Sequence, residues 1–313
     1  MSDTIKNSYL EVFNKQKKHQ FDLGKTSFRE RIKKLDALQR SIQFTYRQAI
    51  REALYADFKK PYIETDLTEI YLVIREIKHA KKNLHYWMSK HRVPTPLALF
   101  GTSSYYIYEP KGVCLIISPW NYPVNLTFTP LVSAIAAGNP VIIKPSELTP
   151  HTSKVMATII KALFNDHEVA LFEGEVEVAQ SLLMLPFNHI FFTGSPKVGK
   201  LVMAAASKHL ASVTLELGGK SPTIIDETAN IKNAIESLVW GKHLNKGQTC
   251  IAPDYLFIHQ SIKDEFLEAY KAKVQCYYSD DPSASSSYSR IVNKSHFDRL
   301  VGYIENAKTQ ALQ

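Results

Sequence analysis

The chain has 313 residues, of which 45% are hydrophobic and 22% are charged, and its net charge at pH 7 is +8. This length suffices for one large or two ordinary domains with a substantial core, and the composition is that of a soluble globular protein. No apolar run approaches the roughly 20 residues that span a bilayer, and the first residues lack the apolar core of a signal peptide. We therefore expect a cytoplasmic protein without a membrane segment.

The excess positive charge is spread along the chain, and much of it lies in the first 92 residues. In the segment 29–34, basic residues stand beside Glu30 on an expected helix. A solvated helix face explains this pattern better than a nucleic-acid site, which needs basic residues gathered on one surface. We expect no nucleic-acid partner, although a basic surface would help to gather an anionic cofactor.

The first 92 residues are expected to be mainly helical. Apolar residues recur at three- and four-residue steps in two stretches, 28–42 and 65–90. No catalytic motif falls here, so we interpret this region as a packing scaffold. Pro94 and Pro96 then stop the helix, and the strand-like alternation over 103–108 predicts an extended arm that leaves the first lobe and returns.

From residue 112 onward, short apolar segments alternate with helical ones. Strands are expected at 112–117, 140–143, 169–172, 189–192, 223–225 and 255–258. Helices are expected at 125–137, 150–164, 175–183, 196–209, 229–243, 261–275 and 296–313, the last with an apolar face that needs a partner. This alternation predicts an α/β fold with a parallel sheet covered on both faces. Ligands of such sheets bind at the carboxyl ends of the strands.

Polar residues follow two of these strands directly. Asn121 stands in a loop stiffened by two prolines and offers an amide donor, and Lys144 and Glu147 follow the next strand. Lys144 and Glu147 could hydrogen-bond to ribose hydroxyls or form a surface ion pair. Asn121 could equally be an ordinary turn residue.

A turn over 194–200 precedes another expected helix, which Ser195 caps. Such a helix N-terminus suits a phosphate. The spacing is close to that of an ATP-binding P-loop, but Leu201 stands where that motif needs a hydroxyl for magnesium. The three-glycine Rossmann fingerprint is absent, so this turn alone is a weak dinucleotide signal.

The three cysteines, Cys114, Cys250 and Cys276, do not make a disulfide framework, and no Cys/His cluster has zinc spacing, so no metal site is expected. Cys114 lies within an apolar strand and is interpreted as core. Cys250 ends a small polar loop, one strand-helix unit after Glu216. A lone cysteine is more often a buried small hydrophobe, but a thiol and a carboxylate that converge form a nucleophile and a base.

Six motifs, in order, resemble those of the aldehyde dehydrogenase superfamily, and in particular its class 3 branch of fatty and aromatic aldehyde dehydrogenases. They lie at 119–123, 136–140, 144–147, 192–195, 215–220 and 247–250. The resemblance implies a Rossmann-type parallel-sheet domain with N-terminal helices (1–92 and 109–214), an extended oligomerisation arm (93–108) and an incomplete α/β catalytic domain (215–313).

The resemblance also implies an NAD(P)-dependent oxidation of an aldehyde to a carboxylic acid through a cysteine thiohemiacetal and thioester. By this resemblance Cys250 is the nucleophile, its backbone N–H and the Asn121 amide bind the oxyanion, and Glu216 activates the hydrolytic water. The cofactor, NAD or NADP, would contact eight residues: Trp120, Lys144, Glu147, Gly194, Ser195, Gly199, Leu217 and Gly218.

Members of this branch continue beyond the point where this sequence stops, with a Glu-x-Phe-Gly-Pro motif that grips the nicotinamide ribose and a segment that completes the dimer. Two hypotheses follow: an active oxidoreductase, dimeric where the C-terminal part is present, or a truncated, non-catalytic nucleotide- or partner-binding relative.

Overall fold

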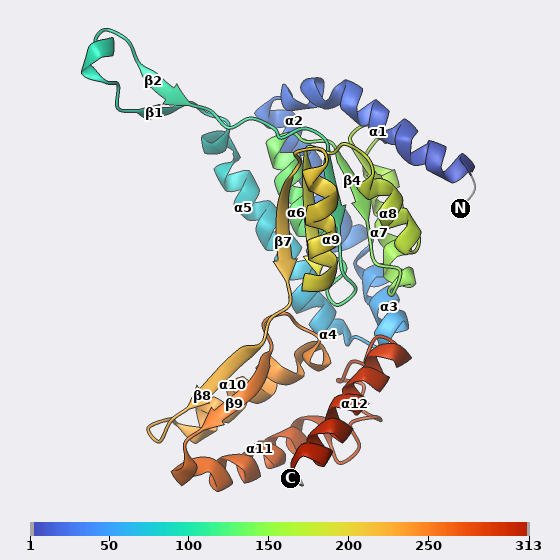
Figure 1. The fold of residues 1–313 in the computed structure, drawn as a ribbon, viewed down its shortest axis with the longest axis vertical. Helices are drawn as coiled ribbons and strands as arrows, with labels where there is room; N and C mark the ends of the chain where they lie inside the picture. The colour runs from blue at the N-terminus through green and yellow to red at the C-terminus, as the bar shows by residue number, and fades with distance from the viewer. Residues whose placement is uncertain (1–2, 312–313) are drawn as a thin grey trace.

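The N-terminal part of the chain is helical, as the sequence predicts, in a computed structural model that describes residues 3–311 (Figure 1). A capping box begins the second helix, where Ser27 and Glu30 each accept a hydrogen bond from the other's backbone N–H. The helical elements are α1 (Asp3–Gly24), α2 (Phe28–Arg40), η1 (Ser41–Thr45), α3 (Arg47–Phe58), α4 (Tyr62–Thr65), η2 (Asp66–Ile70) and α5 (Tyr71–Trp87).

An extended arm follows α5. Strands β1 (His91–Val93) and β2 (Ser104–Tyr106) pair antiparallel, and the hairpin projects from the body of the molecule (Figure 1). At its tip, which includes the short helix η3 (Leu97–Leu99), Leu97 is 87% exposed and Phe100 is 90% exposed. The chain therefore leaves and returns here as the sequence predicts, whereas the oligomerisation role stays a prediction.

A five-stranded parallel sheet forms the centre of the molecule, in the order β5-β4-β3-β6-β7. The predicted parallel sheet is confirmed, but β7 lies outside the six predicted strand ranges. Its sequence alternates polar and apolar residues because β7 is an edge strand with one partly exposed face. The strands are β3 (Cys114–Ile117), β4 (Val141–Lys144), β5 (Val169–Leu171), β6 (His189–Gly194) and β7 (Ser212–Leu217).

Helices cover both faces of this sheet, as expected. Alternate residues of β3 enter different cores: Ile116 packs with α2, α5, α6 and α7, whereas Leu115 packs with α1, α8 and α9. Cys114 is buried in the first core, and burial raises the pKa of its thiol to about 12, consistent with its interpretation as a core residue. The helices between the strands are α6 (Asn125–Ala137), α7 (Pro150–Leu163), α8 (Val176–Leu183) and α9 (Pro196–Ser207).

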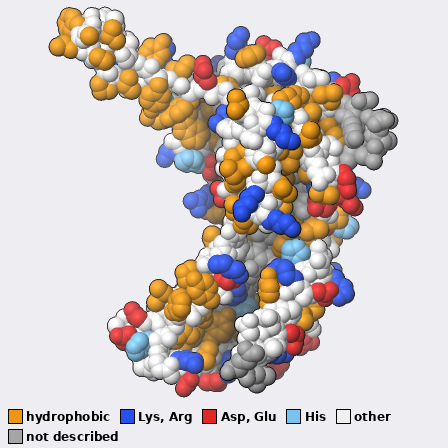
Figure 2. Space-filling view, in the orientation of Figure 1, with side chains coloured by type: hydrophobic (Ala, Val, Ile, Leu, Met, Phe, Trp, Pro, Cys, Tyr) orange, Lys and Arg blue, Asp and Glu red, His pale blue; other side chains and the backbone are white. Residues whose placement is uncertain are grey.

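A second, smaller region follows the central sheet in the chain and lies below it in Figure 1. Its two parallel strands share a core with α10 and α11 on one face, while Ile224 (76% exposed) and Phe257 (59% exposed) stand on the uncovered face. Hydrophobic side chains gather in this region at the lower left of Figure 2. The proposed domain division at 214/215 falls inside β7. The elements here are β8 (Ser221–Ile225), α10 (Ile231–His243), η4 (Leu244–Gly247), β9 (Pro253–Ile258), η5 (Gln260–Ile262), α11 (Lys263–Tyr278) and α12 (Lys294–Ala311).

The last predicted helix, 296–313, corresponds to α12 as far as Ala311, and its final two residues lie outside the described part of the chain. The predicted apolar face is exposed at Phe297, Leu300, Val301 and Ile304.

Candidate active site

The carboxyl ends of β3, β4, β6 and β7 meet at one edge of the central sheet, since all these strands run parallel. Ten of the eleven predicted site residues lie on, or shortly after, one of these strand ends, and Cys250 comes from the loop before β9. The edge therefore gathers loops that are distant in the sequence.

The loop after β3 is joined to the segment that precedes Cys250. Asn121 Nδ2 donates to the backbone oxygen of Gln248 over 2.8 Å, and the hydroxyls of Tyr122 and Thr249 lie 2.6 Å apart. Tyr122 is buried, and burial raises the pKa of its phenol well above the usual value. A neutral Tyr122 thus holds the two loops together at neutral pH.

The segment before Cys250 contains an unusual turn. Asn245 (φ 52°), Lys246 (φ 55°) and Gly247 (φ 74°) all adopt left-handed backbone conformations, which non-glycine residues rarely do. Asn245 is fully buried, and its side-chain Nδ2 donates to the backbone oxygens of Asn121 (2.9 Å) and Gln248 (3.3 Å). These contacts offset the cost of the strained turn.

Cys250 is exposed, and the loop after β7 lies against its backbone. A Cβ built on Gly219 would come within 3.1 Å of the Cys250 carbonyl oxygen. Glu216, three residues before Gly219, is exposed and pairs in register with Thr193 of β6. The structure thus brings the loops of Asn121, Glu216 and Cys250 together, although no hydrogen bond joins the Glu216 and Cys250 side chains among the described residues.

A buried ion pair that the sequence did not reveal lies against the segment that follows β3. Lys60 Nζ lies 2.6 Å from Glu69 Oε1, and both side chains are 0% exposed. Glu69 Oε2 accepts the backbone N–H of Asn125 at 2.9 Å, and Lys60 Nζ sits 4.0 Å from the ring centroid of Tyr122. Burial lowers the pKa of Lys60 and raises that of Glu69, and the attraction between the two charges opposes both shifts.

The N-terminal helices therefore do more than provide the packing scaffold that the sequence suggested, because they support the loops of the candidate site. The sequence gives no local signal of this role, because Lys60 and Glu69 look like surface charges until their burial is known.

The predicted cofactor residues line the ends of β4, β6 and β7. Lys144 is nearly buried, and its Nζ lies 2.5 Å from Oε2 of the partly exposed Glu147. Ser195 Oγ accepts the Val198 N–H at 3.3 Å and so caps α9. Gly194 ends β6 and pairs in register with Leu217.

Close packing brings α9 against the end of β7. A Cβ on Gly199 would lie 3.1 Å from a methyl of Leu217, so the absence of a side chain allows this approach. Gly218 follows in an exposed loop.

Trp120 contacts α12, with its ring centroid 5.0 Å from that of His296. Leu201, the departure from the P-loop pattern, is 62% exposed on α9.

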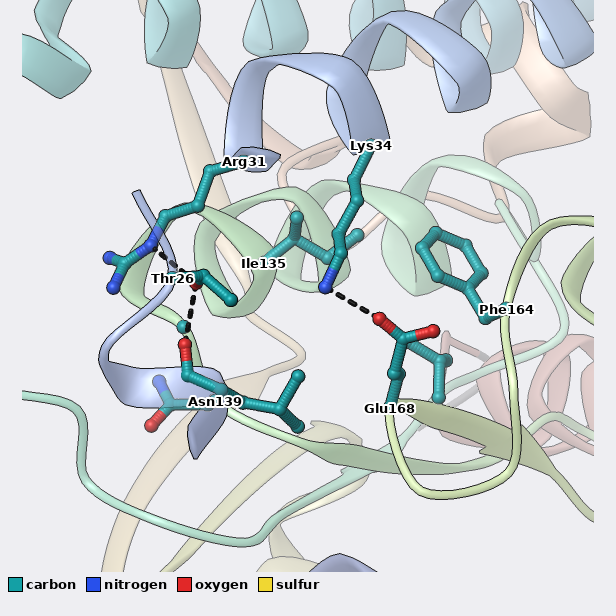
Figure 3. A pocket seen from close by; sticks show the side chains of 10 residues that line it. Thr26, Arg31, Lys34, Ile135, Asn139, Phe164 and Glu168 are labelled. Atoms are coloured by element: carbon teal, nitrogen blue, oxygen red, sulfur yellow. Dashed lines mark hydrogen bonds and ion pairs between the residues drawn. The ribbon is translucent and has the colours of Figure 1, made fainter. Parts of the chain in front are cut away.

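A small pocket lies away from these loops, between α2, α6 and the segment 164–169 (Figure 3). Its volume of about 20 Å³ has room for about one water molecule. The charged residues around it are already paired: Arg31 donates to the backbone oxygens of Ala136 and Gly24, and Lys34 contacts Glu168 at 2.5 Å. We therefore interpret this pocket as structural.

Within the described residues, 3–311, no group of three or more His, Cys, Asp or Glu side chains is arranged to hold a metal ion. The same residues contain no helix that is both long and apolar enough to cross a membrane.

Residues 5–313 match the aldehyde dehydrogenase family. The chain is 47% identical over 283 residues to 4,4'-diaponeurosporen-aldehyde dehydrogenase of Staphylococcus aureus, covering 90% of this chain and 61% of that protein. It is 41% identical over 288 residues to aldehyde dehydrogenase family 3 member B3 of mouse (92% and 60%). It is 40% identical over 309 residues to the rat "Aldehyde dehydrogenase, dimeric NADP-preferring" (98% and 66%).

The solved structure of Staphylococcus aureus AldH in its substrate-bound state superposes with a TM-score of 0.92 at 44% identity, covering 96% of this chain and 65% of that one. The chain thus spans about three fifths to two thirds of the length of these relatives. The motifs, the fold and the matches agree, and the chain belongs to the aldehyde dehydrogenase family, close to its class 3 members.

Proposed function

We propose that this chain carries the nucleophile and the cofactor-binding edge of an NAD(P)-dependent aldehyde dehydrogenase that oxidises an aldehyde to a carboxylic acid. The observation that carries the proposal is the junction of three loops. Asn121 is hydrogen-bonded to the residue two positions before Cys250, and a Cβ added to Gly219, three positions after Glu216, would lie 3.1 Å from the Cys250 carbonyl oxygen.

In this proposal the Cys250 thiolate attacks the aldehyde carbonyl to form a thiohemiacetal. Asn121 uses one N–H of its amide to hold Gln248, and its second N–H and the backbone N–H of Cys250 stabilise the oxyanion. When bound, NAD(P)⁺ supplies the hydride acceptor. The acyl group then remains on the cysteine sulfur as a thioester, and Glu216 takes a proton from the water that hydrolyses it.

The residues at the strand ends fit a dinucleotide. The Thr193 Oγ1 atom, directly before Gly194, is buried and has no hydrogen-bond partner within the described residues, so it is available to a ligand. The N-terminus of α9 offers N–H donors for a pyrophosphate. Lys144 and Glu147 would bind the adenosine ribose, and the Lys144 ammonium can meet either a hydroxyl or a 2′-phosphate.

An apolar aldehyde is the substrate class that we propose. The Staphylococcus aureus relative is named for a diaponeurosporen-aldehyde, and the Cytobacillus firmus relative for a diapolycopene-dial. Both names specify aldehydes of long hydrocarbon chains.

The arm supports a dimer as the working assembly. Its tip exposes Leu97 and Phe100, and the rat relative is named as dimeric. Isolated exposed apolar side chains are common, but two such side chains within four residues at the tip of a projecting hairpin suit contact with a second subunit. Replacing both by Asp should lower the sedimentation coefficient of a dimer to that of a monomer.

The experiment that tests the activity compares Cys250→Ala with Cys276→Ala, which removes the other exposed thiol. With a long-chain aldehyde and NAD⁺ or NADP⁺, we expect Cys250→Ala to abolish NAD(P)H formation and Cys276→Ala to leave it unchanged. Undiminished turnover by Cys250→Ala would reject the proposed nucleophile.

A second candidate function is nucleotide binding without turnover. It is favoured by the uncovered apolar face of β8 and β9, which lies in the same region as Cys250. Saturable quenching of tryptophan fluorescence by NAD(P)H, together with no turnover by the wild-type chain, would select this candidate.

A further inference from the structure

One residue of the N-terminal helices reaches the turn that presents the candidate nucleophile. Glu64, the third residue of the short helix α4, accepts the backbone N–H of Asn245 at Oε2 over 2.9 Å. The two residues are separated by 181 positions in the sequence. Glu64 is 9% exposed and Asn245 is 0% exposed, so water cannot readily replace this hydrogen bond.

The Asn245 turn needs an external support. Asn245 and Lys246 hold positive φ values without being glycine, and each would relax to a right-handed or extended conformation if free. The Asn245 side chain donates to the Asn121 and Gln248 carbonyl oxygens, and Gln248 in turn receives the Asn121 amide. A shift of this turn would therefore move the acceptor that holds the Asn121 amide.

The carboxylate of Glu64 suits this task. A charged acceptor forms a stronger hydrogen bond with a backbone N–H than a neutral one. Burial raises the pKa of Glu64, and the hydrogen bond from the Asn245 N–H and the charge of Lys60 oppose this shift. The Gln248 side chain holds the turn from the other side. Its Nε2 donates to the backbone oxygen of Arg290 at 3.0 Å, and its Oε1 accepts the backbone N–H of Val292 at 3.0 Å. The turn is thus held from both sides, and Glu64 supplies the contact from the N-terminal helices.

We propose that Glu64 is a positioning residue, whose carboxylate fixes the left-handed turn at 245–247 and thereby the relative placement of the Asn121 amide and Cys250. Its effect on turnover rests on the proposed function, whereas its effect on the turn does not. Glu64 itself touches none of the proposed reacting atoms.

The test compares Glu64→Ala and Glu64→Gln with a control, Glu52→Ala, in the full chain. Glu52 is exposed on α3, and its carboxylate accepts a hydrogen bond from the Gln48 amide. Hydrogen-deuterium exchange resolved by peptide reports the turn directly. In Glu64→Ala, we expect exchange in the peptide containing 244–250 to accelerate about tenfold, because a buried N–H loses its acceptor. Peptides of α7 and α8 should keep their wild-type rates.

Glutamine keeps a carbonyl oxygen as an acceptor, so Glu64→Gln should restore most of the protection that Glu64→Ala loses. Glu52→Ala should match wild type. Unchanged exchange at 244–250 in Glu64→Ala, or equal acceleration in all peptides, would each overturn the proposal.

A second readout separates this proposal from the proposed function. If wild type turns over aldehyde, Glu64→Ala should lower kcat about tenfold or more while leaving KM for NAD(P)⁺ within about twofold, since the strand-end cofactor residues are untouched. A fall in cofactor affinity equal to the fall in kcat would overturn the positioning role. If wild type shows no turnover, the proposed function fails and the exchange data still decide the role of Glu64.

Discussion

The amide nitrogen of Asn121 lies 2.8 Å from the carbonyl oxygen of Gln248, 127 positions further along the chain. This contact joins the end of β3 to the loop of the candidate nucleophile. It orients the amide, because the donated N–H fixes the plane of the group and so the direction of its second N–H. The Asn121 side chain therefore connects the two loops and is also a candidate oxyanion donor.

Replacing Asn121 with Ala should lower kcat by about 100- to 1000-fold, the range typical for loss of one oxyanion donor. The KM for the cofactor should change little. Steady-state kinetics with the aldehyde and NAD(P)⁺ measures both effects, and Asn83→Ala on α5 serves as the control. Turnover by Asn121→Ala within twofold of wild type would contradict the assigned donor.

The buried Lys144 and the partly exposed Glu147 form a pair that should control cofactor choice. A 2′-phosphate placed near Lys144 would be repelled by the Glu147 carboxylate. Glu147→Gln removes this charge, so we expect the ratio of the dissociation constants for NADP⁺ and NAD⁺ to fall about tenfold. Titration by calorimetry measures both constants, and an unchanged ratio would show that Glu147 does not face the 2′ position.

Local sequence predicted which candidate residues follow strand ends, because those strands can be recognised from short apolar runs. The run before Lys144 and the Ser195-Pro196 pair that opens α9 are examples. The edge strand β7 was not among the predicted ranges, since one partly exposed face breaks its apolar run. Strand order could not be derived from such patterns, because the pairing of β3 with β6 depends on contacts between distant segments.

The buried network under the loops could not be predicted for the same reason. Glu64 looks like any helical carboxylate in the sequence, and its meaning comes from the N–H of Asn245, 181 residues away. Lys60 and Glu69 are nine residues apart and look like a surface pair until burial is known. Sequence patterns indicate which face of a helix or strand is buried, whereas the tertiary fold decides which groups pair with a buried charge.

Asp66 should make stability depend on pH in the acid range. Burial alone would raise its pKa, but hydrogen bonds from Arg51 and Arg47 outweigh burial and hold the pKa below its usual value. A lowered pKa means that the unfolded state binds more protons, so the contribution is full above the unfolded pKa of about 3.9 and is lost as pH falls through the folded pKa.

Asp66→Asn should therefore cost about 1–2 kcal/mol of unfolding free energy at neutral pH. The difference from wild type should shrink below about pH 4, where Asp66 of the unfolded chain begins to bind a proton, and should disappear as pH falls through the lower folded-state pKa. Urea unfolding at several pH values measures this, with the exposed Glu52→Gln as the control. A difference that stays constant down to the acid transition would show that the arginine contacts do not set the pH dependence.

Gly199 should be required for the contact between α9 and the end of β7. A Cβ there would lie 3.1 Å from Leu217, so alanine forces a small shift, which its higher helix propensity partly offsets. Valine adds two further methyl groups at the same point. We expect Gly199→Val to cost about 1–3 kcal/mol of stability, the usual range for overpacking. Since Leu217 and Gly218 are proposed cofactor contacts, the dissociation constant for NAD(P)⁺ should rise as well.

The matched control is Gly302 on α12, where a Cβ would meet no atom within 4 Å. Gly302→Val should leave cofactor affinity unchanged and alter stability by only the small difference in helix propensity. Thermal unfolding and cofactor titration of both valine variants measure the two effects. Equal results for the two variants would mean that the close approach of α9 to Leu217 does not shape the cofactor edge, whereas a selective loss in Gly199→Val would tie that packing to nucleotide binding.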